Sequence, residues 1–426
     1  KFKVSVNKAN ALASGIAKPT DTMVDELLID FNPNRQYLLK NELAMYAIIA
    51  TSDFKRPICF TSTQELKELG LDKYVRQTGL SYQLVPVLNQ TIDADVAYKN
   101  MMTKFSFGNA KNPNVYFDEE NRRHLNSMRL AFSQVAQALA IEGKRDSAQQ
   151  LLRKLDAETN EKNFPYGMTS NRGNQHNYFS YLFLQACYAS GELKLAKKVS
   201  VSLLKDLVEN HGVLGIKTSF EDEGASLMEV IRLKELCNQA GTKILLKIAG
   251  AEAKRDLEDS MMIGVKGIVA PMIESPFALD KFIKSAKSIL PPDVLSNVQL
   301  GINIETIGAF KNFSEMTKAD GFNDLYHITL GRVDFVSSMN KDRSYVNSDE
   351  ILNIAGDLFA KSREMSKRVY LGGAITLDSK EFMKKLFTKG LLDKFETRYV
   401  MYDPAIALNN LENALLSGQK LELAIL

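Results

Sequence analysis

Residues 298–309 read VQLGINIETIGA, and residues 325–338 read LYHITLGRVDFVSS. Each stretch begins with a continuous apolar run and continues into a helical pattern. Such runs are typical of strands that helices cover on both faces. The same arrangement recurs at 212–220, 242–250, 265–272, 368–375 and 397–403. Seven β/α units are therefore predicted over residues 211–426, in a (β/α)8-type TIM barrel or a doubly wound sheet. A barrel would need an eighth strand, which the pattern does not reveal.

The stretch before the barrel is helical. Helical patterns cover residues 122–143, 144–158, 176–191 and 192–210. The first and third end on glycine and are followed at once by a second helix, which is the tetratricopeptide (TPR) pattern. Two such pairs are fewer than the roughly three repeats that a free-standing solenoid needs. We predict a domain of TPR-like helical hairpins at 119–210 that packs on another part of the chain.

The first 118 residues mix both element types. Strand patterns occur at 1–6, 26–30, 57–61 and 80–88, and helical spacing at 41–51 and 62–71. The turn-forming sequence NAKNPN at 109–114 marks the end of this region. The fold class as a whole is thus multi-domain α/β, with an N-terminal α+β region at 1–118.

Composition excludes several classes of protein. A net charge of +3 over 426 residues gives no reason to expect a nucleic-acid partner. The sequence has no apolar run long enough to span a bilayer, and its first residues do not resemble a signal peptide. Its three cysteines are too widely spaced to form a metal-ligand pair.

The carboxyl ends of the predicted strands hold most of the candidate chemistry, because barrel active sites lie at that rim. The residues expected there are Glu221, Asp222, Lys247, Glu274, Glu305, Arg332, Asp334, Gly372, Gly373, Tyr402 and Asp403. Several carboxylates at one rim repel one another unless a cation is present. Mg²⁺ or Mn²⁺ suits such oxygen ligands. Glu305 and Asp334, on adjacent strands, are the best ligand pair, although acids at these positions also cap helices.

Four of these motifs, taken in order, resemble a known family. FEDEG, VAPMIES, NIETIGAF and LGRVDFVSSM are similar to motifs of the HpcH/HpaI aldolase and citrate lyase β-subunit family. The resemblance implies a barrel lyase or aldolase that uses Mg²⁺ or Mn²⁺, held by Glu305 and Asp334. The metal would chelate a small oxo-acid and stabilise the enolate formed when a carbon–carbon bond breaks. A ring-like homo-oligomer is also implied.

Two positions depart from that family. Lys247 stands nearest the place of an arginine, and no histidine accompanies the acids of the early strand. We therefore expect Lys247 to neutralise the substrate or enolate, and Asp222 or a metal-bound water to act as the base. Arg332 is a candidate anion contact.

Lys247, Arg332 and the Gly372-Gly373 strand end together suggest an anionic ligand, and Glu221 is expected to bind substrate beside them. His327 lies within a strand and is expected in the core.

The first 210 residues resemble a different family. KFKVSVNKANALASGI, the DFKRPICFT segment and the helix pairs are similar to the soluble tail of bacterial protein O-mannosyltransferase-like membrane proteins. The two resemblances imply an extracytoplasmic first half and a cytoplasmic barrel, so the chain is interpreted as a composite of two unrelated proteins. Two alternatives to a lyase stay open. One is a non-catalytic binding or assembly protein whose TPR-like helices contact a protein partner, and the other is an accessory domain of a membrane glycosyltransferase.

Overall fold

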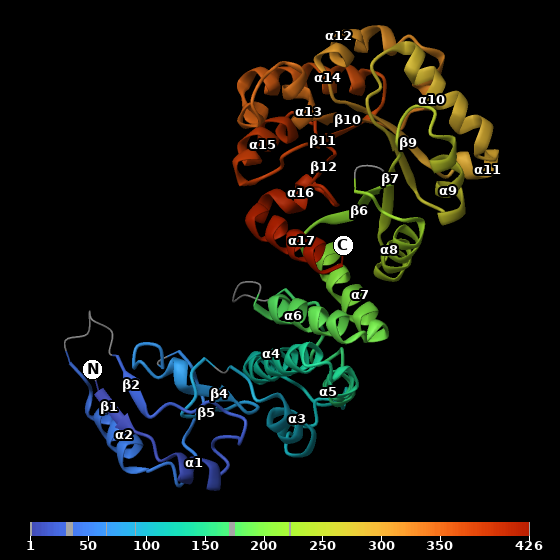
Figure 1. Cartoon of the computed structure of the whole chain (residues 1–426). Coiled ribbons are helices and arrows are strands. Elements are labelled where there is room, and N and C mark those ends of the chain that lie inside the picture. Colours follow the sequence, from blue (N-terminus) through green and yellow to red (C-terminus); the bar gives the residue numbers. More distant parts are fainter. Residues whose placement is uncertain are drawn as a thin grey trace. The chain divides into compact units, whose positions relative to one another are not determined.

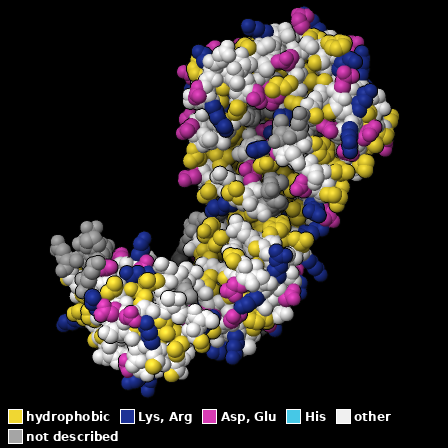
Figure 2. Space-filling model, viewed as in Figure 1, with side chains coloured by type: hydrophobic (Ala, Val, Ile, Leu, Met, Phe, Trp, Pro, Cys, Tyr) yellow, Lys and Arg dark blue, Asp and Glu magenta, His cyan; other side chains and the backbone are white. Residues whose placement is uncertain are grey.

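The computed structural model describes residues 2–30, 37–64, 66–89, 91–169, 175–220 and 223–425. The chain divides into two compact units, Lys1–Pro165 with Phe179–Ala196, and Tyr166–Tyr178 with Lys197–Leu426. Within the described ranges, each helix is too short or too polar to cross a membrane. Basic and acidic side chains are interspersed on the visible face (Figure 2), as the small net charge leads one to expect.

The amino-terminal unit contains two small sheets. Strand β1 (Phe2–Ser5) pairs antiparallel with β2 (Glu26–Ile29). A second sheet has the order β3-β5-β4, formed by Cys59–Phe60, Tyr82–Leu84 and Val75–Gln77. The short helices beside them are α1 (Lys8–Ala13), α2 (Lys40–Thr51) and α3 (Ala94–Thr103). This region therefore contains both strands and helices, and its extent as a separate α+β region at 1–118 stays a prediction.

One predicted helix of this region is wrong. The described residues of 62–71 form turns rather than a helix. Leu66, Leu69 and Leu71 are all buried, and the Tyr46 hydroxyl donates to the Leu69 carbonyl at 2.8 Å. Gly70 has a left-handed φ of +66° and lies so close to Asp30 that a Cβ would fall 2.3 Å from its carbonyl oxygen. The free energy gained by burying these leucines on several sides of the segment outweighs the helical preference that their spacing indicates.

Four long helices follow, as the sequence predicts. They are α4 (Glu119–Ile141), α5 (Arg145–Glu158), α6 (Gln175–Ser190) and α7 (Leu193–Asn210). Gly143 and Gly191 both adopt the left-handed conformation that ends a helix. The division between the two units runs through α6 and α7. Their assignment as TPR repeats stays a prediction.

The second unit contains a closed eight-stranded barrel, which confirms the barrel over the doubly wound sheet (Figure 1). The strands are β6 (Val213–Ser219), β7 (Lys243–Lys247), β8 (Gly267–Ala270), β9 (Gln299–Ile304), β10 (His327–Gly331), β11 (Arg368–Gly372), β12 (Lys394–Glu396) and β13 (Val400–Tyr402). From β6 to β12 each strand runs parallel to the next. The eighth strand, which the sequence pattern does not reveal, is β12, and it is only three residues long.

The last strand departs from a regular (β/α)8 barrel. Strand β13 is antiparallel to both β12 and β6, because only Thr397, Arg398 and Tyr399 join it to β12. Its carboxyl end therefore lies at the amino end of the parallel strands, where the Asp403 N–H donates to the Gly212 carbonyl at 2.7 Å. The expectation that Tyr402 and Asp403 share the rim with Glu305 is wrong.

Helices surround the strands (Figure 1). They are α8 (Leu227–Ala240), α9 (Lys254–Ile263), α10 (Pro276–Ile289), α11 (Pro292–Leu295), α12 (Ile307–Met316), α13 (Arg332–Ser338), α14 (Asp349–Glu364), α15 (Lys380–Thr388), α16 (Pro404–Ala407) and α17 (Leu411–Ile425). Several begin directly after a strand, so short loops hold the strand ends in place. These loops form the rim at which the candidate site lies.

Candidate active site at the carboxyl end of the barrel

Glu305 is the best-defined acidic side chain of the rim. It follows β9 directly and is only 5% exposed. Its Oε2 accepts the Met272 N–H at 3.2 Å, and its Oε1 accepts the Asn303 side-chain amide at 3.0 Å. The carboxylate is thus fixed by two donors from β9 and from the loop after β8.

The neighbouring backbone is shaped around this carboxylate. A Cβ on Gly331, at the end of β10, would lie 2.7 Å from Cγ and 2.8 Å from Oε1 of Glu305. Met272, which donates to Glu305, has a φ of +50°, a conformation that costs free energy for a residue with a side chain. Glycine at 331 and a strained residue at 272 together leave space for the carboxylate and point a donor at it.

The electrostatic surroundings of Glu305 contain one cation and one further acid. Burial raises the pKa of Glu305 above its ordinary value, and the negative charge of Asp334 acts in the same direction. The Lys247 ammonium and the two hydrogen bonds oppose that increase in pKa. Lys247 ends β7 and is half-buried, whereas Asp334 is exposed in the first turn of α13. The structure thus brings three predicted site residues within electrostatic range.

A second lysine–glutamate pair lies at the same end of the barrel. The Lys217 Nζ of β6 donates to Glu396 Oε1 of β12 at 2.7 Å. Glu396 is buried, and among the described residues its Oε2 has no hydrogen-bond partner. Gly372 gives it room, since a Cβ there would lie 3.3 Å from Glu396 Oε1. This pair was not predicted from the sequence, although Lys217, which interrupts the apolar run of 212–220, was a signal that could have indicated it.

Arg332 occupies a different place from the one expected for a substrate contact. Its guanidinium is fully buried and donates to the carbonyls of Gly372 (3.2 Å), Gly373 (2.7 Å) and Val346 (3.2 Å), and to Asn347 Oδ1 (2.6 Å). Burial lowers its pKa to about 9. Arg332 therefore holds the Gly372-Gly373 strand end in position, and we classify it as a positioning residue.

The remaining predicted residues are Glu221, Asp222, Glu274 and His327. Glu221 and Asp222 lie outside the described residues. Glu274 is exposed and accepts the Thr306 hydroxyl at 2.5 Å, beside the amino end of α12. His327 is buried and stacked on Tyr370 with ring centroids 4.4 Å apart, which confirms its place in the core.

The atoms near Glu305 that could bind a metal ion are oxygen atoms. Besides the two carboxylates, the buried Oδ1 of Asn303 has no hydrogen-bond partner in the described part of the chain. Oxygen ligands of this kind fit a hard divalent cation. In the same part of the chain, no group of three or more His, Cys, Asp or Glu side chains is arranged to hold a metal. The described residues thus show oxygen atoms beside Glu305 but no complete metal-binding group.

Comparison with known proteins gives a different result for each half. Residues 1–104 match the family model of the TMEM260-associated domain 2. No curated protein sequence matches the chain.

Among solved structures, the citrate synthase SbnG is similar, with 14% identity over 52% of this chain and 89% of its own, and a TM-score of 0.40. An HpcH/HpaI aldolase/citrate lyase family protein from Burkholderia cenocepacia has 12% identity over 51% and 90%, and a TM-score of 0.39. An HpcH/HpaI aldolase from Desulfitobacterium hafniense has 11% identity over 48% and 82%, and a TM-score of 0.37. The chain is therefore similar to the TMEM260-associated domain 2 over its first 104 residues, and its structural neighbours include HpcH/HpaI aldolase/citrate lyase family members.

Proposed function

We propose that the barrel is a divalent-metal-dependent carbon–carbon lyase that cleaves a small oxo-acid at its carboxyl end. The observation that carries this proposal is the surroundings of Glu305. A buried carboxylate is fixed by two donors, within electrostatic range of one lysine and one further acid. The resemblance of the strand-end motifs to the HpcH/HpaI family supports the same reaction class.

Glu305 and Asp334 would hold the metal. Burial of Glu305 next to a second acid is costly without a compensating cation. Lys247 compensates part of that charge. A bound Mg²⁺ or Mn²⁺ would compensate the rest and would supply Lewis-acid stabilisation of negative charge on the substrate.

The protein's own residues have separate roles in this proposal. Lys247 attracts the substrate carboxylate toward the rim, as a point charge rather than a bidentate fork. Arg332 fixes the Gly372-Gly373 strand end, whose backbone lies beside the substrate. Asp222 is retained as the candidate base and Glu221 as a candidate substrate contact, both on sequence grounds alone.

The direct test is the release of pyruvate from a 4-hydroxy-2-oxo-acid by the full chain, with and without Mn²⁺. The matched variants are Glu305→Gln and Glu274→Gln, which remove one negative charge from a buried and from an exposed position at the same rim. We expect Mn²⁺-dependent release that Glu305→Gln reduces by about 10²–10³-fold and that Glu274→Gln leaves intact. Release that is equal in wild type and Glu305→Gln would contradict the proposal.

For residues 1–104 we propose a non-catalytic structural role. The matching family model describes an associated domain, which is in line with this role. The buried charges of this region are paired among themselves. The guanidinium of Arg76 contacts Asp21 at 2.7 Å and Asp93 at 3.4 Å, and Lys18 contacts Asp93 at 2.8 Å. Charged side chains that pair with one another in this way suit a structural role. We expect no sugar transfer by the full chain in an assay with mannosyl donors, and transfer would contradict this assignment.

A further inference from the structure

A cavity lies at the amino end of the barrel, opposite the candidate active site. It has a volume of about 300 Å³. Its wall is formed by residues at or near the starts of the parallel strands, including Lys243, Gly267, Gln299, Arg368 and Lys394, together with residues of the antiparallel β13 and its neighbours. A cavity of this size accommodates a small molecule.

The charge of this cavity is mostly positive. Lys243, Lys266, Lys394 and Arg368 line it, with Asp393 as the one acid among the lining residues. Asp393 Oδ1 already contacts Arg368 and Arg363 at 2.8 Å each. Its Oδ2 accepts the Val369 N–H at 2.8 Å. Asp393 therefore leaves the charge of the three lysines largely uncompensated.

Lys394 is the most constrained of the three lysines. It is buried, with its Nζ 3.8 Å from the centre of the Tyr370 ring and 3.2 Å from the Met401 sulfur. Neither neighbour carries a negative charge, and the nearby Glu396 is bonded to Lys217. Burial lowers the pKa of Lys394 to about 8. The negative charges of Glu396 and Asp393 oppose this decrease, and the charges of Lys217 and Lys243 add to it. An ammonium in this position gains free energy from any anion that enters.

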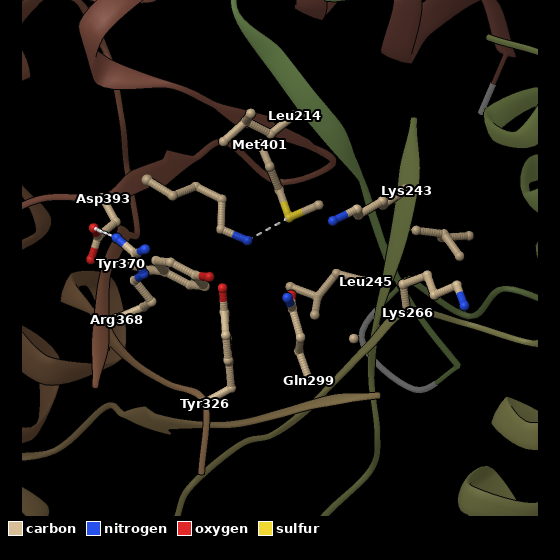
Figure 3. Close-up of a pocket in the computed structure, with 13 residues that line it drawn as sticks. Leu214, Lys243, Leu245, Lys266, Gln299, Tyr326, Arg368, Tyr370, Asp393 and Met401 are labelled. Carbon is tan, nitrogen blue, oxygen red and sulfur yellow. Dashed lines mark hydrogen bonds and ion pairs between the residues drawn. The ribbon is translucent and has the colours of Figure 1, made fainter. Parts of the chain in front are cut away.

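Other polar groups point to the same space. Figure 3 shows the Lys243 amine, the Gln299 amide and the Tyr326 hydroxyl directed toward the middle of the cavity. The Tyr370 hydroxyl lies beside them, whereas the Lys266 amine points away. Within the described part of the chain, Lys243 and Gln299 form no side-chain hydrogen bond or ion pair. Two cations and several neutral hydrogen-bonding groups thus converge without a carboxylate between them.

We propose that the amino-terminal mouth of the barrel binds a small anion that carries a phosphate or carboxylate group, held by Lys243 and Lys394. Charge-assisted hydrogen bonds from two ammonium groups fix the anionic group, and Gln299 and Tyr326 donate to its remaining oxygens. The site is separate from Glu305, because it lies at the opposite ends of the same strands. It therefore does not depend on the lyase proposal.

The test is isothermal titration calorimetry of the full chain with orthophosphate and, separately, with malonate. Lys243→Gln is the first variant, because Lys243 is exposed at the start of β7 and its replacement leaves the core intact. Lys394→Met is the second and removes the buried charge. The control is Lys254→Gln, which removes the same charge from an exposed position at the start of α9, after the carboxyl end of β7.

We expect saturable binding of at least one of the two anions, weakened about tenfold or more by Lys243→Gln, which corresponds to about 1.4 kcal/mol. Lys394→Met should weaken it further, and Lys254→Gln should leave it unchanged. Binding of orthophosphate alone assigns a phosphate ligand, and binding of malonate alone assigns a carboxylate. No saturable binding of either anion, or equal weakening by Lys254→Gln, overturns the proposal.

Discussion

The two ends of the barrel are built from the same strands but differ in how their charges are balanced. At the carboxyl end, Glu305 and Glu396 are buried, each near a lysine. At the amino end, Lys243 and Lys394 face a cavity whose one acid is paired with two arginines. The carboxyl end thus combines acids with lysines, whereas the amino end is lined mainly by basic side chains.

Under the two proposals, this difference would suit each end to a different ligand. Carboxylates with a partly compensated charge attract a cation, and ammonium groups without a carboxylate attract an anion. The hydrogen bonds differ in the same way. At Glu305 two donors point at one acceptor, whereas at the mouth Lys243 and Gln299 have no side-chain hydrogen bond within the described part of the chain.

The largest effect is expected from Glu305→Gln. Removing the charge while keeping the shape should reduce Mn²⁺-dependent oxo-acid cleavage by about 10²–10³-fold, as loss of one transition-state-stabilising group does. Anion binding at the amino mouth should not change. Steady-state kinetics and calorimetry on the same preparation check both parts, and a variant impaired equally at both ends would indicate a folding defect.

A smaller loss is expected from Gly331→Ala. The added methyl group would fall 2.7 Å from Glu305 Cγ, so the carboxylate must move. A displacement of about 1 Å at a reacting centre costs about 100-fold in rate. The matched control is Gly356→Ala in α14, where a Cβ meets nothing within 4 Å. Unchanged kcat/KM in Gly331→Ala would show that the position of Glu305 does not matter for cleavage.

The amino end should show a pH-dependent cost in stability. The pKa of Lys394 falls from 10.5 to about 8, so the folded state binds its proton less tightly than the unfolded state. Its unfavourable contribution is absent above pH 10.5, grows as pH falls toward 8, and is complete below 8. The charged groups that act on it are Lys217, Lys243, Asp393 and Glu396.

Lys394→Met should therefore stabilise the unit at pH 7. The shift of about 2.5 pH units corresponds to about 3 kcal/mol, and loss of the contact with the Tyr370 ring offsets about 1–2 kcal/mol of it. A net gain of about 1–2 kcal/mol remains, to be measured by urea unfolding at pH 7. The gain should shrink at pH 10, and a variant destabilised equally at both pH values would contradict this account.

Anion binding should follow the same titration. Because the Lys394 ammonium carries part of the binding, the affinity of the mouth for malonate should be highest below pH 8 and fall as pH rises through about 8. Calorimetry at pH 6.5 and pH 9 measures the change, for which about two- to fivefold is expected while Lys243 stays charged. Malonate, unlike phosphate, does not itself titrate in this range. Equal affinity at the two pH values would remove Lys394 from the site.

The sequence predicts the barrel because its strands are long apolar runs, and it places Glu305, Asp334 and Gly372 near strand ends because those runs stop there. It does not reveal β12, whose three residues Lys394, Phe395 and Glu396 include two charges that are buried only in the folded chain. The direction of β13 was not predicted because, without β12, helix α15 would join β11 directly to β13, and a helical crossover connects parallel strands.

The role of Arg332 was missed for a related reason. A sequence shows that an arginine adjoins a strand end, but not that four oxygens converge on its guanidinium. The basic cavity was not predicted because barrel active sites lie at the carboxyl ends of strands, so the starts of the strands gave no reason to expect a site. Lysines at those starts look like ordinary exposed residues until the barrel closes and brings them together.

The most direct test of the account is the binding of Mn²⁺ itself, followed by electron paramagnetic resonance as free Mn²⁺ disappears during titration. The account predicts one Mn²⁺ bound per chain in wild type and in Glu274→Gln, with binding lost in Glu305→Gln. Wild-type protein that binds no Mn²⁺, or Glu305→Gln that binds it as tightly as wild type, would contradict the assignment of the carboxyl end as a metal-dependent site.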